Sequence, residues 1–264
     1  MSIEIPLISI VMPCYNAEKS INQSIQSVLN QTYLNWELII VDDCSIDQTP
    51  NIVSNIIDSR VHFYRLNANS GGPSRPRNFA LELCRGKYVS FLDADDIWES
   101  DKLELQVSML ENDYDIVCSN YTLFLDNNID EVFSCRKFPR EFNFRDMLKW
   151  NCIGNLTGIY NREKLGVVFQ KDYGHEDYIM WLELVKRVGK VYCVQKPLAR
   201  YRVTKNSISS DKVKAAKWQW QIYRRELGFS IITSCYYFGY YIINAIKRRL
   251  INKNSLECAN SDLS

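Results

Sequence analysis

Short apolar runs alternate with helix-like segments along the first part of the chain. The apolar runs have the length of buried strands and occupy residues 7–12, 37–41, 61–66 and 87–92. The segments between them have helical patterns and occupy residues 17–31, 49–57 and 74–84. Strands that alternate with helices at this spacing predict βαβ units. We therefore expect an α/β fold with a mostly parallel, doubly wound sheet.

Polar residues follow three of these strands at the point where each strand ends. Residues 13–16 follow the first strand, Asp42 and Asp43 follow the second, and residues 93–96 follow the fourth. Ligands of doubly wound sheets bind beyond the carboxyl ends of the strands. The three polar groups are therefore expected to meet in one crevice.

The second half of the chain is less regular. Strands are predicted at residues 115–118, 155–160, 191–194 and 198–203. A helix is predicted over residues 176–188, because Ile179, Leu182 and Val185 share one helical face. No internal repeat, low-complexity tract or linker divides the sequence, so these elements are expected to belong to the same unit.

The C-terminal region has an unusual composition. Residues 228–246 are nineteen residues without a charge, and residues 247–249 are basic. This length approaches the ~20 residues that a membrane-spanning helix needs, but Ser230, Thr233 and positive charge on both flanks disfavour a spanning helix. An interfacial helix whose basic residues meet anionic lipid fits better, and an ordinary packing helix is the second interpretation. The residues after Asn252 are predicted to be disordered.

Composition and missing motifs exclude several classes of function. A net charge of +1 gives no basis for binding nucleic acid. None of the nine cysteines forms a Cys-x-x-Cys pair, which argues against zinc ribbons and thioredoxin-like motifs and favours buried, reduced thiols. The Gly-x-Gly-x-x-Gly and Walker A patterns of dehydrogenases and P-loop enzymes are also missing. The N-terminus does not resemble a secretory signal, so we expect a cytoplasmic location.

Asp93 and Asp95 stand one residue apart directly after the apolar run at residues 87–92. Carboxylates this close repel each other, which raises a pKa unless a cation or hydrogen-bond donors compensate. A hard divalent cation that bridges two phosphates of a nucleotide would supply that compensation. The alternative is a solvated acidic turn that caps the next helix.

Two further groups allow two interpretations each. Asp42 and Asp43 either bind a base or ribose hydroxyl, as acids at strand ends do in dinucleotide folds, or cap the helix that follows. The loop at residues 69–78 combines glycines, a helix N-terminus and the side chains of Arg75 and Arg77. That combination suits a phosphate group, but it also fits a tight turn with surface arginines.

A third candidate group lies in the second half. Glu176 and Asp177 begin the predicted helix at residues 176–188, where acids complement the helix dipole and where one of them can act as a general base. For His175 a structural role is favoured over a role as a ligand. The basic loop at residues 200–207 either closes over a leaving diphosphate or is a solvated connection.

Six sequence blocks occur in a recognisable order. They are ISIVMPCYN at residues 8–16, SVLNQTY at 27–33, ELIIVDD at 37–43, RN at 77–78, GKYVSFLDADD at 86–96 and EDYIMW at 176–181. In this order they closely resemble family 2 glycosyltransferases of the GT-A fold. The similarity is dense over residues 6–110, thinner to residue 208, and not visible beyond it.

The resemblance implies an inverting sugar transfer from a nucleotide-diphosphate donor, most simply a UDP-sugar, with Mn²⁺ or Mg²⁺ as cofactor. The acceptor would be a glycan or lipid-linked oligosaccharide of O-antigen, capsule or lipooligosaccharide synthesis. The catalytic base would be Asp177, and Asp95 of the Asp-x-Asp motif would bind the metal. The remaining substrate contacts would be Pro13, Tyr15, Asp42, Asp43, Arg77, Asp93, Ala94, Glu176 and Arg202. Tyr15 would lie near the base of the nucleotide, and Arg202 near the diphosphate.

The resemblance also defines the expected organisation. The GT-A domain covers residues 1–208, divided into a nucleotide-sugar-binding half at 1–113 and an acceptor-side half with a smaller mixed sheet at 114–208; C-terminal helices occupy residues 209–251 and a flexible tail residues 252–264. Residues 218–249 would contact the inner face of the cytoplasmic membrane. Two alternatives are a sugar nucleotidyltransferase, whose glycine-rich N-terminal signature is missing here, and a non-catalytic nucleotide-sugar-binding protein.

Overall fold

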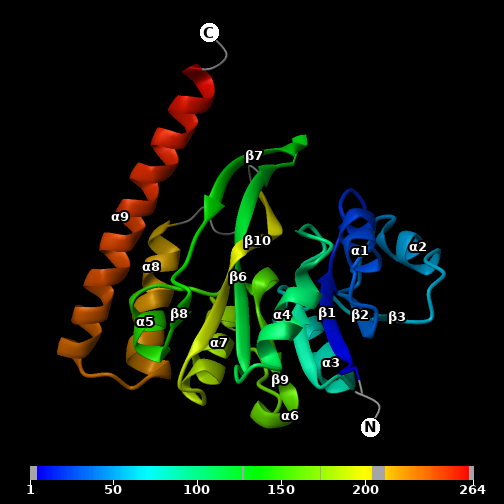
Figure 1. Cartoon of the computed structure of the whole chain (residues 1–264), viewed down its shortest axis with the longest axis horizontal. Helices are drawn as coiled ribbons and strands as arrows, with labels where there is room; N and C mark the ends of the chain where they lie inside the picture. The colour runs from blue at the N-terminus through cyan, green and yellow to red at the C-terminus, as the bar shows by residue number, and fades with distance from the viewer. Residues whose placement is uncertain (1–4, 127, 173, 204–211, 262–264) are drawn as a thin grey trace.

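The structure is a computed structural model that describes residues 5–126, 128–172, 174–203 and 212–261 (Figure 1). Its strands are β1 Ile8–Cys14, β2 Trp36–Asp42, β3 Val61–Arg65, β4 Tyr88–Phe91, β5 Ile97–Trp98, β6 Ile116–Leu125, β7 Asn128–Arg136, β8 Glu141–Phe142, β9 Ile159–Asn161 and β10 Val191–Val203. Its α-helices are α1 Ile21–Leu29, α2 Thr49–Ser54, α3 Ser74–Leu83, α4 Lys102–Leu110, α5 Phe144–Lys149, α6 Arg162–Leu165, α7 Glu176–Lys186, α8 Lys212–Gln221 and α9 Ile231–Ser261. The 3₁₀-helix η1 Asn155–Thr157 and the π-helix η3 Ile222–Glu226 complete the elements.

One half of the sheet has the predicted βαβ architecture. Strands β3, β2, β1 and β4 lie side by side in this order and are all parallel. The chain moves outward from β1 to β3 and then crosses back through α3 to β4, on the other side of β1. The order of strands therefore reverses between β1 and β4, where a doubly wound sheet forms its ligand crevice.

The second half extends the same sheet. Strand β9 joins β4 to β6 and runs antiparallel to both, and β10 lies parallel to β6. Strand β10 is continuous, with register shifts between Val194 and Arg200, although the sequence predicted two strands there. The strand predicted at residues 155–160 begins as η1 instead, and β9 starts at Ile159. The mixed acceptor-side strands are therefore continuous with the first half and do not form a smaller sheet of their own.

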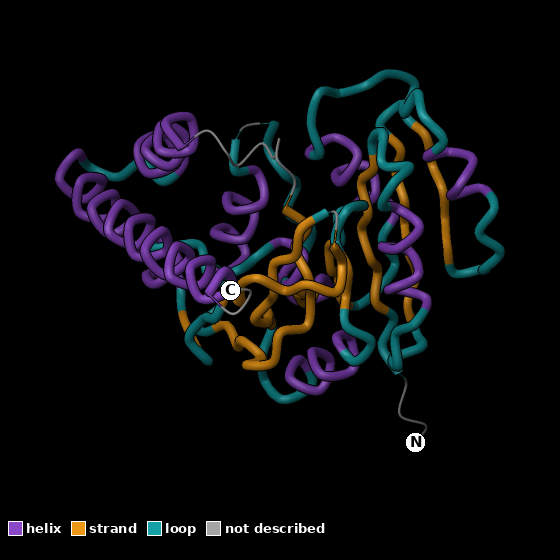
Figure 2. The backbone as a smooth tube through the Cα atoms, turned by 90° about the horizontal axis from the view of Figure 1, so that it is seen from above, coloured by secondary structure: helices purple, strands orange, loops and turns teal. Residues whose placement is uncertain are grey.

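Helices cover both faces of the sheet (Figure 2), because the central strands are apolar on both sides. In β1, Ile8, Ile10 and Met12 belong to one core, which is shared with α1 and α4. Val11 belongs to the opposite core, which is shared with α3, α5 and α7. Such continuous burial is typical of parallel strands between two helix layers. It fixes the positions of the strand ends and therefore of the polar residues that follow them.

The C-terminal segment packs against the second half of the molecule as α8, η3 and α9 (Figure 1). Helix α9 contacts α5 and β7 and continues through residues 252–261, where the sequence predicted a disordered tail. Residues 204–211, with the second half of the predicted basic loop, and residues 262–264 lie outside the described residues. In the part of the chain that is described, no helix combines the length and apolar character needed to cross a membrane.

Candidate active site

A cavity of about 490 Å³ lies at the point where the strand order reverses. Seven residues that were predicted to bind the substrate or the metal line this cavity: Pro13, Tyr15, Asp43, Arg77, Asp93, Ala94 and Asp95. They come from the ends of β1, β2 and β4 and from the start of α3. The expected convergence of three strand ends in one crevice is present in the structure.

Asp43 organises the loop that forms one wall of the cavity. Its carboxylate accepts hydrogen bonds from the backbone N–H of Ser70, at 3.0 Å to each oxygen, and from the Ser70 hydroxyl at 2.9 Å. Its carbonyl accepts a bond from the Asn69 side chain at 3.2 Å. Gly71, which follows Ser70, has a φ of +80°, a value that glycine adopts without strain. Sequence reasoning did not single out Ser70, although it lies in the glycine loop that was noticed.

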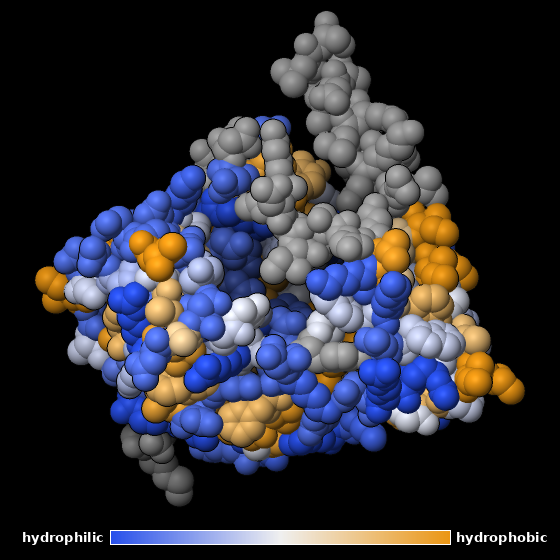
Figure 3. Space-filling view, turned by 180° about the vertical axis from the view of Figure 1, so that it is seen from behind, coloured by the Kyte–Doolittle hydropathy of each residue, from blue (hydrophilic) through white to orange (hydrophobic). Residues whose placement is uncertain are grey.

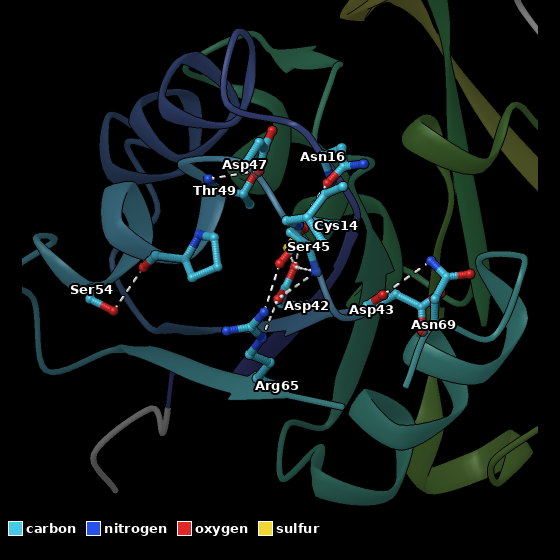
Figure 4. A network of polar contacts seen from close by, with 12 residues as sticks. Cys14, Asn16, Asp42, Asp43, Ser45, Asp47, Thr49, Ser54, Arg65 and Asn69 are labelled. Atoms are coloured by element: carbon cyan, nitrogen blue, oxygen red, sulfur yellow. Dashed lines mark hydrogen bonds and ion pairs between the residues drawn. The ribbon is translucent and has the colours of Figure 1, made fainter. Parts of the chain in front are cut away.

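The neighbouring Asp42 has a different environment. Its side chain is fully buried and points toward Ser45 and Arg65 (Figure 4). The backbone N–H of Ser45 donates to both carboxylate oxygens at 3.2 and 3.1 Å, and the Arg65 guanidinium lies 3.2 Å away. Asp42 is not among the described residues that line the cavity. The geometry therefore favours the structural interpretation of Asp42 over the nucleotide contact that the resemblance implied.

Arg77 connects the cavity with the second half of the molecule. It is only 4% exposed, and its Nη2 donates to Asp93 at 2.6 Å. Its Nη1 donates to Glu176 at 3.3 Å and to Gln170 at 3.0 Å. Burial opposes the charge of Arg77, but the nearby carboxylates, Asp93 above all, outweigh it and raise the pKa of the guanidinium. The buried guanidinium of Arg77 therefore joins residues 93–96 after β4, called the acidic turn below, to the start of α7. Nothing in the sequence indicated Gln170.

Asp95 lines the cavity beside Asp93. Partial burial raises the pKa of Asp95 to about 6, and the negative charge of Asp93 adds to this effect. A bound cation would offset both causes, since each disfavours the charged carboxylate. Among the described residues, no three His, Cys, Asp or Glu side chains form a preformed metal cage. The residues present fit a cation held by one or two carboxylates together with substrate phosphates, which is the usual arrangement for Mg²⁺.

Arg202 braces the acidic turn from outside the cavity. Its Nε donates to the carbonyl of Asp95 at 2.7 Å, and its guanidinium also binds Asp126 at 3.0 Å and Gln23 at 2.7 Å. Its backbone N–H donates at 2.9 Å to the buried Asp96, whose pKa is raised well above its usual value by burial and then by Asp95. These contacts occupy the guanidinium. Arg202 thus holds the turn at Asp95 and Asp96, and the contact with the diphosphate that the resemblance implied stays a prediction.

Helix α7 begins with the predicted acidic pair. Burial, followed by the charge of Asp177, raises the pKa of Glu176, while Arg77 opposes the shift. The Oδ1 of Asp177 accepts a hydrogen bond from the backbone N–H of Tyr178 at 2.8 Å. The preceding residue, His175, has a left-handed φ of +66°, which is strained for a residue other than glycine. Arg77 therefore links the two acidic groups, although Asp177 does not itself line the described cavity.

The sequence matches a known protein family. The family model described as glycosyl transferase family 2 matches residues 9–165, which is more than half of the chain. The chain belongs to this family. It is a glycosyltransferase with a GT-A fold, as the sequence blocks predicted. This membership disfavours both alternatives, the nucleotidyltransferase and the non-catalytic binding protein.

Two relatives match nearly the whole length of this glycosyltransferase. The putative teichuronic acid biosynthesis glycosyltransferase TuaG of Bacillus subtilis (strain 168) is 39% identical over 251 residues, covering 93% of this chain and 98% of its own. The UDP-Glc:alpha-D-GlcNAc-diphosphoundecaprenol beta-1,3-glucosyltransferase WfgD of Escherichia coli is 39% identical over 250 residues, covering 92% and 94%.

Two solved structures share the fold. The structure of S. aureus TarS 1-349 with UDP-GlcNAc has a TM-score of 0.70 at 21% identity, with 89% of this chain and 71% of that chain covered. The mannosyltransferase PcManGT from Pyrobaculum calidifontis, in complex with GDP-Man and Mn2+, has a TM-score of 0.64 at 19% identity, with 98% and 76% covered. At these identities, the similarity establishes the architecture.

Proposed function

We propose that this enzyme transfers a sugar from a UDP-sugar, with inversion at the anomeric carbon, to a hydroxyl group of a lipid-linked glycan. The observation that carries the proposal is the Arg77 network, in which one buried cation binds Asp93 at the cavity and Glu176 at the start of α7. Inverting displacement needs a base and a leaving-group site on opposite sides of the sugar. The network brings a second acidic element, separate in sequence, next to the cavity.

The cavity has suitable groups for a nucleotide diphosphate. Tyr15, which is 48% exposed at the cavity, offers a ring on which a base can stack. Asp43 and Ser70 fix the loop wall, and Asp95 also lines the cavity. We propose that Asp95, with Asp93 beside it, holds Mn²⁺ or Mg²⁺. A cation bound there would neutralise charge on the departing diphosphate.

Asp177 is the proposed general base. It accepts the proton of the acceptor hydroxyl while the acceptor oxygen bonds to the anomeric carbon and the bond from that carbon to the diphosphate breaks. Arg77 is close enough for an electrostatic interaction with Asp177. Glu176, held by Arg77, orients the first turn of α7.

The substitution Asp177→Asn tests this assignment. General-base catalysis typically contributes 10²–10⁴-fold, so kcat is expected to fall on that order while UDP binding stays unchanged. Glu183→Gln is the matched control, because Glu183 lies on the same helix and pairs only with the surface residue Arg187 in the described contacts. Sugar transfer can be followed as UDP release, and UDP binding by calorimetry. Unchanged transfer by Asp177→Asn would refute the role of this residue.

The proposed acceptor follows from the similar proteins. WfgD is named for a diphosphoundecaprenol-linked substrate, and TuaG for teichuronic acid biosynthesis. We therefore propose that this enzyme builds a bacterial surface polysaccharide on a lipid carrier, at the inner face of the cytoplasmic membrane.

An exposed face of α9 supports membrane contact. This face, called the α9 outer face below, consists of Ile231, Ile232, Cys235, Tyr236, Tyr240, Ile242, Ile243, Ala245 and Ile246. At 3.6 residues per turn, these positions cover about 220° of the helix circumference. On the remaining side, Tyr237 packs on the protein core, and Phe238, which lies between Ala245 and Ile231 around the helix axis, packs on it as well. Surface helices normally turn polar residues outward, and a continuous apolar surface marks an interaction site.

Charge around this face favours a lipid surface as its partner. Figure 3 shows hydrophobic residues along the edge of the molecule that α9 forms. Lys247 is exposed at the end of the α9 outer face, and Lys214, Lys217 and Arg225 are exposed on the preceding α8 and η3. An apolar face with basic neighbours is typical of helices that lie in the interface of anionic bilayers. Residues 218–249 are therefore proposed as the membrane contact.

A further inference from the structure

The ring of Trp218, in α8, lies directly against the turn that precedes Asp177. A Cβ atom added to Gly174 would come within 2.1 Å of two ring atoms of Trp218 and within 2.6 Å of a third. Real Cβ atoms do not approach other heavy atoms this closely, so only glycine fits at this position without a shift. The Trp218 ring also meets the edge of the His175 ring, with centroids 5.4 Å apart and planes at 80°. The C-terminal segment thus packs on residues 174 and 175.

Residues 174–177, called the base turn below, need external support. His175 is in the left-handed region, with φ of 66° and ψ of 40°. No side chain among the described residues caps the N-terminus of α7, and the His175 Nε2 is buried without a described hydrogen-bond partner. Backbone strain and unpaired buried polar groups persist only where surrounding contacts determine the conformation. For the base turn, Trp218 supplies such a contact.

The base turn and the residues before it also contact α3 of the nucleotide-sugar-binding half, called the donor half below. Asn78 of α3 donates to the carbonyl of Gln170 and accepts from its backbone N–H, both at 2.7 Å. Arg77 binds Glu176 within the base turn. These contacts come from α3, which precedes the base turn in sequence. The Trp218 contact comes from α8, more than forty residues after the base turn. The position of Asp177 therefore depends on both the cavity wall and the C-terminal segment.

We propose that Trp218 is a positioning residue for the catalytic base, so that the C-terminal segment contributes to sugar transfer as well as to membrane contact. This proposal rests on the proposed role of Asp177. Trp218 does not line the donor cavity, so its loss leaves the walls of that cavity in place. It removes the ring that packs on Gly174 and His175, which allows the base turn to leave its strained conformation and displaces Asp177.

The experiment compares Trp218→Ala and Trp218→Phe with Trp220→Ala in the full chain. Trp220 is the matched control, because it lies on the same helix and packs on Phe238 of α9, with centroids 5.5 Å apart. We expect Trp218→Ala to lower kcat on the order of 10- to 100-fold, since small misplacements of catalytic groups have effects of this size. The donor KM and UDP binding should stay unchanged. Trp218→Phe should recover most of the lost rate, and Trp220→Ala should keep kcat.

A double-mutant cycle adds a readout that general destabilisation would not produce. Gly174→Ala is expected to lower kcat in the wild-type background, where the new methyl group meets the ring, but to have little effect beside Trp218→Ala. Additive effects of the two substitutions would overturn the proposal, as would a Trp218→Ala variant that keeps its kcat or loses UDP binding in parallel. If Asp177→Asn is inactive and Trp218→Ala fully active, only the role of Trp218 fails. If Asp177→Asn is fully active, the base assignment itself fails.

Discussion

Asp42 and Asp43 are neighbours in sequence, yet their side chains have different tasks. Asp43 lines the cavity and binds Ser70 of the loop wall, whereas Asp42 is buried against Ser45 and Arg65. Both interpretations of this pair were open from the sequence, because either acid at a strand end can bind a ligand or a following turn. What separates them is the identity of their partners, which lie up to 28 residues away in sequence.

The different environments of Asp42 and Asp43 predict that the same substitution affects UDP binding at one position and stability at the other. Asp43→Asn is expected to weaken UDP binding by about tenfold or more, because a hydrogen bond to a charged group is worth ~1.5–3 kcal/mol and the loop wall depends on it. Asp42→Asn is expected to lower the free energy of unfolding by about 1–3 kcal/mol and to leave UDP affinity unchanged. Calorimetry and thermal denaturation of both variants measure the two quantities. A similar loss of UDP affinity in both would contradict the assignment.

Other residues show where sequence reasoning succeeds and where it stops. Asp93 and Asp95 were predicted because two acids directly after an apolar strand are a local signal, and both line the cavity. Gln170 was missed, because a lone glutamine has no such signal until Arg77 is placed beside it. For Arg202, the contact with the diphosphate stays a prediction, and its contacts with Gln23 and Asp126 could not be predicted, because these partners lie in distant segments.

At the scale of elements, the four strands and three helices predicted over residues 7–92 lie within a few residues of their observed bounds, whereas β5 and α4 were not predicted. The differences lie where tertiary contacts override local pattern. Strand β10 pairs with β6 on both sides of the register shifts between Val194 and Arg200. Because of this pairing, one strand forms in place of two. The helical backbone of α9 extends through residues 252–261, where the sequence predicted a disordered tail.

The α9 outer face predicts binding to anionic vesicles. The full chain is expected to co-sediment with vesicles that contain phosphatidylglycerol and to bind less at high salt, because basic residues contribute. Ile232→Lys with Ile243→Lys should abolish binding, since both side chains are exposed on this face. Ile57→Lys is the control, because Ile57 is fully exposed next to α2 and distant in sequence from α9. Wild-type protein that stays in solution, or a dimer that the paired substitution dissociates, would contradict a lipid partner.

At the scale of the whole molecule, a single ten-stranded sheet joins the donor half and the acceptor-side half. The sequence indicated two halves because its pattern changes near residue 114, but pattern alone does not show which strands pair. Strand β9 makes the connection, since it bonds to β4 on one side and to β6 on the other. The Arg77 network spans the same boundary from the donor half to α7.

This continuity predicts that UDP stabilises the molecule as one cooperative unit. Calorimetry is expected to show a single thermal transition over residues 1–208, because unfolding of either half would expose the other side of the shared sheet. UDP with Mn²⁺ at about 100 times its dissociation constant should add ~2.7 kcal/mol to the free energy of unfolding. For a chain of this size, that corresponds to a rise in Tm of about 5–10 °C. Asp95→Asn should reduce the part of this rise that depends on Mn²⁺ and leave the transition single. Two separate transitions, of which UDP shifts only one, would show instead that the two halves unfold independently. The pairing of β9 with β4 and β6 and the Arg77–Glu176 ion pair would then be too weak to couple them.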